Sequence, residues 1–286
     1  MSNADLAIVS LKGLSIGDAL GAALGEGVST EAAGAEADHG ALPGTPWQWT
    51  DDTHMALSVV EVLLNYGEIY EDALAERFAQ RYSEEPYRCY GEGAAWLLRQ
   101  YADGESWREL AKEVFQGGSY GNGAAMRAAP IGAYFASDPA TAADQARKSA
   151  MVTHRHPDGQ AGAIAAGSNR LSGSDLLSAV LLHVPMSETR DGIEAAMKFP
   201  PSRYSEAVKQ LGVGWNVTAQ DTVPFCLWCA AHHIGDFKTA IWQTLRGGGD
   251  RDTTSAIVGG IVAPAAGEIP EDWESCCEPF PDDVEF

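Results

Sequence analysis

The sequence is short of basic residues. Only 19 of its 286 residues are Lys or Arg, against 40 Asp or Glu, and the formal charge is −21. This deficit argues against a nucleic-acid interface, which needs a basic patch, and against an anionic membrane surface. We therefore expect neither membrane binding nor binding of unmodified nucleic acid. An anionic ligand would have to be held by backbone amides or metal ions.

Long apolar runs and disulfide-like cysteine patterns are also lacking. Without a run of some eighteen apolar residues, no transmembrane helix is expected. No basic stretch precedes the apolar residues near the N-terminus, so no signal peptide is expected. The five cysteines are an odd number in a long chain and fit a reducing compartment better than a disulfide framework. We expect a cytoplasmic monomer.

Alternating β-branched patterns are nearly absent, and apolar residues recur at helical spacing instead. Met55, Val59 and Val62 share a face of a helix expected over 52–65. Asp138 followed by Pro139 predicts a helix start, and Asp236 can cap a helix that ends at Gly247. The pattern predicts an all-α fold of about a dozen short helices. We expect one domain over residues 1–272 and an acidic tail over 273–286, with a poorly packed surface stretch from Glu268 onward.

Two segments near opposite ends of the chain have the same design. Thr50-Asp51-Asp52-Thr53 and Asp250-Arg251-Asp252-Thr253 each open an expected helix with two carboxylates and neighbouring hydroxyls. Helix capping explains either segment alone. If the two helix starts meet, however, four carboxylates converge, which is costly unless cations lie between them. Hard oxygen ligands suit Mg²⁺ or Mn²⁺, so the pair predicts a two-metal site.

A glycine-rich loop occupies residues 117–123 and carries Tyr120, whose ring could stack on a nucleobase. We expect a helix containing Met126 and Arg127 to follow it. Backbone amides at such a position can hold a phosphate without lysines, although a plain flexible turn fits the loop equally well.

Histidines and cysteines form two further groups. His154 and His156 precede Pro157, and one of them could point into a cleft, although structural or solvated histidines are commoner. Cys226 and Cys229, with His232 and His233 after them, lack a second ligand pair at zinc-like spacing. They are expected to be structural residues of a buried helix.

Taken together, these segments resemble the ADP-ribosylglycohydrolases. The resemblance covers roughly residues 10–272 and rests on five motifs in the family's order. They are Gly-Asp-Ala-Leu-Gly at 17–21, Thr-Asp-Asp-Thr-His-Met at 50–55, Gly-Ser-Tyr-Gly-Asn-Gly-Ala-Ala-Met-Arg at 118–127, Thr-His at 153–154 and Gly-Gly-Asp-Arg-Asp-Thr at 248–253. The loop and residues 77–82 look most like the branch that acts on serine-linked and poly-ADP-ribose. The resemblance implies a compact orthogonal multi-helix bundle.

The resemblance also implies a dinuclear Mg²⁺ or Mn²⁺ site and a ligand-binding loop. The matching metal ligands are Thr50, Asp51, Asp52, Asp250, Asp252 and Thr253. The matching ligand-binding residues are Gly118, Ser119, Tyr120, Gly121, Asn122 and His154. The chain departs from the family at one position, because Gly25 stands where a glutamate is usual. Glu26 follows it, and we expect Glu26 to take that glutamate's place; the alternative is that the role is absent from this chain.

The reaction implied is hydrolysis at C1″ of ADP-ribose attached to a protein or another target. Asp51, Asp52 or Glu26 would accept a proton from the attacking water. Two alternatives stay open: a protein that binds ADP-ribose without cleaving it, and a two-metal phosphohydrolase that cleaves the pyrophosphate. The sequence does not distinguish arginine-linked, serine-linked, O-acetyl, polymeric or nucleic-acid-linked ADP-ribose.

Overall fold

The computed structural model describes residues 1–25, 42–115, 117–167 and 174–281. Over these ranges the chain is helical and forms no strand, only two isolated β-bridges. The helices are α1 (Asn3–Leu24), α3 (Asp51–Tyr66), α4 (Glu71–Glu84), α5 (Glu92–Ala102), α6 (Trp107–Glu113), η1 (Asn122–Ala124), α7 (Ala129–Tyr134), α8 (Pro139–Met151), α9 (Pro157–Ala166), α10 (Ser174–Leu181), α11 (Glu188–Ala196), η2 (Pro201–Arg203), α12 (Tyr204–Leu211), α13 (Ala219–His233), α14 (Phe237–Arg246), α15 (Arg251–Ala266) and α16 (Glu271–Glu274). The predicted all-α class is confirmed.

Local signals in the sequence explain several helix boundaries. The Asp138 side chain accepts a hydrogen bond from the amide of Thr141, and Pro139 begins α8. Asp236 likewise accepts from the amide of Thr239 at the start of α14, which ends before Gly247. The predicted starts of both helices are confirmed, because a carboxylate at the N-cap satisfies an amide that the helix itself cannot.

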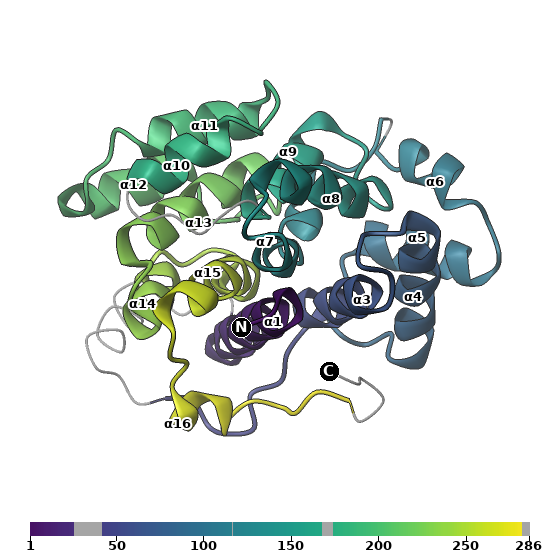
Figure 1. The fold of residues 1–286 in the computed structure, drawn as a ribbon, viewed down its shortest axis with the longest axis horizontal. Helices are drawn as coiled ribbons and strands as arrows, with labels where there is room; N and C mark the ends of the chain where they lie inside the picture. The colour runs from purple at the N-terminus through teal and green to yellow at the C-terminus, as the bar shows by residue number, and fades with distance from the viewer. Residues whose placement is uncertain (26–41, 116, 168–173, 282–286) are drawn as a thin grey trace.

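Helices α1 and α15 lie side by side at the centre of the molecule (Figure 1). Among the described helices, α1 is long and apolar enough to cross a membrane, but 72% of its apolar window is buried inside the protein. A core helix meets the same test of length and composition. The remaining elements surround this pair, with α3 and α7 against α1, and α13 and α14 against α15.

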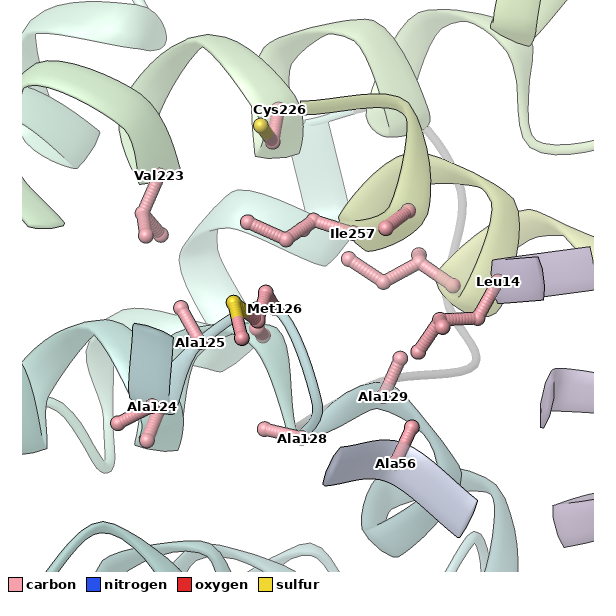
Figure 2. Packing of buried hydrophobic residues seen from close by; sticks show 14 of the residues in the cluster. Leu14, Ala56, Ala124, Ala125, Met126, Ala128, Ala129, Val223, Cys226 and Ile257 are labelled. Carbon is pink, nitrogen blue, oxygen red and sulfur yellow. The ribbon is translucent and has the colours of Figure 1, made fainter. Parts of the chain in front are cut away.

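The core beside this central pair is built from small side chains. Figure 2 shows Leu14 of α1 and Ile257 of α15 facing Ala56 of α3 and Ala129 of α7. All four side chains are at most 4% exposed. Small residues let the helix axes approach closely, so the starts of α3 and α15 come near each other.

The prediction of a poorly packed tail is wrong for residues 273–281. Trp273 is buried and packs edge-on against Trp47. The Trp47 amide donates to the Cys276 carbonyl, and Glu278 forms a two-pronged ion pair with Arg88. The acidic composition hides these contacts, because their partners lie far away in the sequence. Residues 282–286 lie outside the described residues.

Candidate active site

The two acidic helix starts meet at one cavity. Asp51 and Asp52 lie in the first turn of α3, while Asp250 precedes α15 and Asp252 lies in its first turn. All four carboxylates line the same cavity of about 710 Å³, together with Thr50 and Thr253. The structure therefore brings together the six residues predicted as metal ligands.

Helix capping does not account for these carboxylates. In α3 the cap is Thr50, whose hydroxyl oxygen accepts from the Asp52 amide at 3.4 Å. In α15 the N-cap residue is Asp250, but its side chain makes no capping hydrogen bond. It accepts instead from the Asn122 side-chain amide at 2.7 Å. The acids are thus available for another role.

Asp18 is a site residue that was not singled out from the sequence. This buried residue of α1 accepts four hydrogen bonds: from the Thr50 amide (2.9 Å) and hydroxyl (2.9 Å), and from the Thr53 amide (3.1 Å) and hydroxyl (2.6 Å). A single carboxylate thereby fixes the turn that carries Asp51 and Asp52. The available signal was its place in the Gly-Asp-Ala-Leu-Gly motif at 17–21, an acid within an otherwise apolar stretch.

Burial and mutual repulsion disfavour the ionised form of carboxylates in this cluster. Desolvation first, and then the neighbouring carboxylates, raise the pKa of Asp51 to about 8. The same two causes raise the pKa of Asp250 to about 8 and that of Asp52 well above its usual value. Carboxylates with such raised pKa values favour bound protons or bound cations over free charge.

The donor chemistry suits hard divalent cations. The hydroxyl oxygens of Thr50 and Thr253 lie 3.0 and 3.4 Å from Asp52 Oδ2. Asp52 Oδ1 is buried and lacks a hydrogen-bond partner in the described structure. Within the same ranges, no group of three or more Asp, Glu, His or Cys side chains has the arrangement of a preformed metal site. The cluster is thus a set of facing oxygens with one unsatisfied acceptor.

The glycine-rich loop forms another wall of the cavity, but Gly118 does not. Residues 119–123 line the cavity, whereas a Cβ at Gly118 would lie 2.4 Å from that of Arg155. The amides of Gly118, Gly121 and Asn122 donate to Val114, Ser119 and Val217. In the described structure, the amides of Ser119 and Tyr120 remain as donors that no protein group occupies.

The predicted helix containing Met126 and Arg127 is wrong. A 3₁₀ turn over Asn122–Ala124 is followed by non-helical turns, and α7 begins at Ala129. Pro130 explains the late start, because it has no N–H to donate to the carbonyl of Met126 four residues earlier.

The two neighbouring histidines have different surroundings. His154 is buried and lines the cavity beside the loop. His156 lies at the N-cap of α9, where its Nδ1 accepts from the Asp158 amide, and its ring packs edge-on against Tyr120. Tyr120 itself is 41% exposed, so its ring remains available to a ligand. Cys226 and Cys229 are buried in α13, as expected of structural residues.

Three further cavity residues could not be recognised from the sequence. Cys89, Phe115 and Val217 are the described non-glycine residues with positive φ, and all three line the cavity. Such backbone conformations are costly, above all for a β-branched residue, and they concentrate at functional sites. Glu26 lies outside the described residues. Its neighbour Gly25 lines the cavity and accepts a hydrogen bond from Arg251.

A helical protein that collects carboxylates from both ends of its chain around one cavity belongs to the class of ligand-binding or catalytic α-proteins. Comparison with protein-family models identifies which one. The model of the ADP-ribosylglycohydrolases matches residues 2–285, and the chain belongs to that family.

Individual relatives agree with this membership. ADP-ribosylhydrolase ARH3 of Homo sapiens is 29% identical over 288 residues, which cover 83% of this chain and 78% of the relative. The ADP-ribosyl-(dinitrogen reductase) glycohydrolase of Rhodospirillum rubrum is 26% identical, and the match covers 95% of this chain and 90% of the relative. A solved structure titled as an ADP-ribosylglycohydrolase-related protein complex superposes with a TM-score of 0.63 at 25% identity, covering 97% of this chain and 93% of its own.

Proposed function

We propose that this chain removes ADP-ribose from a modified target by hydrolysing the N- or O-glycosidic bond at C1″. The observation that carries the proposal is that four carboxylates and a glycine-rich loop line the same cavity. Its volume is within the roughly 300–1,000 Å³ of sites that enclose small ligands. The names of the relatives point to the same reaction. Of these two names, only that of the Rhodospirillum rubrum protein specifies a target, dinitrogen reductase, so the target of this chain stays open.

Two divalent cations, Mg²⁺ or Mn²⁺, fit the acidic wall of the cavity. The residues that would hold them are Thr50, Asp51, Asp52, Asp250, Asp252 and Thr253. Because two cations would share four carboxylates, neither needs three carboxylates of its own. The partnerless Asp52 Oδ1 and the raised pKa values of Asp51 and Asp250 support this assignment, because cations would neutralise the charge that burial disfavours. When bound, the cations would orient the ribose hydroxyls and stabilise developing charge.

We assign proton transfer and the positioning of the site to side chains of this chain. A water oxygen forms the new bond to C1″ while the glycosidic bond breaks, and the proton that the water loses passes from the accepting carboxylate to the leaving group. Asp51 or Asp52 accepts the proton of the attacking water, and Glu26 is the further candidate for this role. Asn122 and Asp18 are positioning residues, because they fix Asp250 and the Thr50–Thr53 turn through the hydrogen bonds described above.

The loop wall accounts for the rest of the ligand. The free amides of Ser119 and Tyr120 supply donors for the pyrophosphate in a protein with few basic residues. The exposed ring of Tyr120 offers a stacking surface for adenine. His154, which lines the cavity beside the loop, is a further residue that would contact the ligand.

The test is the Asp52→Asn variant, assayed for ADP-ribose release from serine- and arginine-modified peptides with Mg²⁺ or Mn²⁺. We expect turnover to fall by at least about a thousandfold, as losses of catalytic charge typically do. Urea unfolding should show a folded protein. The matched control is Asp144→Asn, an exposed acid of α8 paired only with Arg147 and Lys148, which should keep full activity.

The products separate the two alternatives. Release of AMP and ribose phosphate would replace the proposal with pyrophosphate cleavage. Metal-dependent binding of ADP-ribose without turnover on any linkage would replace it with a binding protein. Full turnover by Asp52→Asn would remove the acidic cluster from the mechanism.

A further inference from the structure

Arg127 is a buried cation that no carboxylate of the described chain pairs with. It is fully buried, and its guanidinium lies over the Phe78 ring at 4.6 Å. Nη1 donates to the Gly123 carbonyl at 3.1 Å, and Nη2 donates to the Ser149 carbonyl at 2.9 Å. Burying a charge without a counter-ion costs free energy, so we expect this guanidinium to have a functional role.

A further hydrogen bond of Arg127, to Thr153, indicates what this role is. Nη2 also donates to the Thr153 hydroxyl oxygen at 2.8 Å, and this oxygen lies 2.7 Å from His154 Nδ1. A guanidinium can only donate, so Thr153 must accept from Arg127. Its own hydroxyl hydrogen has one acceptor among the described residues, His154 Nδ1. With Nδ1 as the acceptor, a neutral imidazole carries its proton on Nε2.

The Nε2 edge of His154 lies against the glycine-rich loop. A Cβ added at Gly121 would be 3.4 Å from Nε2, and one added at Gly123 would be 3.3 Å away. Both glycines line the cavity, as does His154. Within the described part of the chain, no protein group forms a hydrogen bond with Nε2. The donor is therefore directed at the place where a ligand would lie.

Burial keeps this imidazole neutral, and the charge of Arg127 adds to the effect. Burial, together with the nearby guanidinium, lowers the pKa of His154 to about 3. Two separate effects thus act on the same ring: the positive charge opposes a second proton, and the Thr153 hydroxyl decides which nitrogen holds the first.

We propose that Arg127 and Thr153 are positioning residues that hold His154 as the neutral Nε2–H tautomer, so that it donates to an anionic oxygen of the ligand at the 119–123 loop. The ligand's identity rests on the proposed function, and a pyrophosphate oxygen is the acceptor it supplies. An extra donor is needed there because three of the five amides from Gly118 to Asn122 are already bonded within the protein.

The first experiment measures the tautomer by long-range ¹H–¹⁵N NMR of the full chain, with histidine labelled by ¹⁵N and no ligand present. His154→Gln assigns the signal among the seven histidines. We expect a protonated Nε2 and a hydrogen-bonded, unprotonated Nδ1 at pH 7. Thr153→Val should remove the hydrogen-bond shift of Nδ1 and admit the second tautomer, while Thr153→Ser should keep the wild-type signals. A wild-type signal from Nδ1–H or from imidazolium would overturn the inference.

The second experiment titrates ADP-ribose into the same variants in the presence of Mg²⁺. We expect Thr153→Val to bind about tenfold more weakly, as for one lost hydrogen bond to a charged group, and Thr153→Ser to bind as the wild type does. Unchanged affinity in a Thr153→Val protein that has lost the tautomer would overturn the positioning role. If the wild type has the expected tautomer but ADP-ribose does not bind, the proposed function fails and the tautomer assignment stands.

Discussion

At the scale of single residues, the site depends on Asp18 as much as on the carboxylates that line the cavity. Asp18 Oδ2 accepts from the amides of Thr50 and Thr53 and from the Thr53 hydroxyl, while Oδ1 accepts from the Thr50 hydroxyl. The same Thr50 hydroxyl also bonds to Asp52. One acid on α1 thus decides where the first turn of α3 presents its own two acids.

We predict that Asp18→Ala lowers the free energy of unfolding by about 3 kcal/mol or more, because it leaves several buried donors without acceptors. The matched variant is Asp18→Asn, whose amide oxygen can still accept at the Oδ2 position, so its loss should be clearly smaller. Urea unfolding measures both changes, and Mg²⁺ titration measures the effect on the acidic cluster. Equal stability of the two variants would show that the four hydrogen bonds do not hold the turn.

At the scale of elements, the contact between α1 and α15 brings the two ends of the chain together. Gly13, Gly17 and Gly21 lie four residues apart on one face of α1 and meet α15 in reverse order. A Cβ on each would come within 2.5 Å of a backbone oxygen of α15, namely that of Gly259, Ser255 and Arg251 respectively. These glycines permit the close approach that places Asp18 near the start of α15.

We predict that Gly17→Ala destabilises the protein by about 1–3 kcal/mol, because its methyl group would lie 2.1 Å from the Ser255 carbonyl oxygen. Separation of the helices should also weaken Mg²⁺ binding, since α1 carries Asp18. The control is Gly235→Ala, where nothing lies within 4 Å of the added Cβ and φ is not positive. It should leave both stability and Mg²⁺ affinity within experimental error. A stable Gly17→Ala protein would mean that the two helices can part without cost.

Elements were predictable from the sequence wherever the signal was local. The carboxylate caps at Asp138 and Asp236 and the acidic starts at Asp51 and Asp250 need only near neighbours, and the helices they mark are present. The sequence predicted a metal site only if the two acidic helix starts meet. No local signal decides whether two helix starts meet in the fold.

What escaped prediction depends on partners far away in the sequence. The four donors to Asp18 lie more than thirty positions away. The contacts of Trp273 with Trp47 and of Glu278 with Arg88 span more than 180 positions, so an acidic composition looked like a loose tail. The positive φ of Cys89, Phe115 and Val217 follows from the cavity wall they form and has no signature in residue type.

At the scale of the whole molecule, an excess of negative charge surrounds a buried cluster of carboxylates. The chain has a formal charge of −21, and the cluster has no Lys or Arg ion pair within the described ranges. Self-repulsion of this kind opposes folding unless protons or cations neutralise it. Stability should therefore depend on both pH and divalent cations, and in a coupled way.

We predict that, in EDTA, the protein becomes less stable as the pH rises from 6.5 to 8. Asp51 and Asp250 each have a folded pKa of about 8, above the usual 3.8, so the folded state retains protons that the unfolded state has lost. The stability these protons confer is complete below pH 3.8 and disappears as the pH rises through about 8. Each retained proton contributes up to about 1.4 kcal/mol per pH unit. Burial lowers the pKa of His54 and His154 to about 3, so these groups oppose the slope near pH 6.5, where the unfolded state still binds their protons. Their effect fades above the ordinary histidine pKa, and the carboxylates dominate toward pH 8.

Mg²⁺ should oppose this loss, because a cation competes with protons for the same oxygens. The stabilisation by Mg²⁺ should therefore be larger at pH 8 than at pH 6.5, and the slope seen in EDTA should flatten or reverse. Urea unfolding at four pH values, with Mg²⁺ or EDTA, measures both effects, and Asp51→Asn should show a weaker pH slope in EDTA. If stability in EDTA instead rose with pH, or if Mg²⁺ stabilised equally at both ends, the cluster would not be the coupled proton and cation site argued for here.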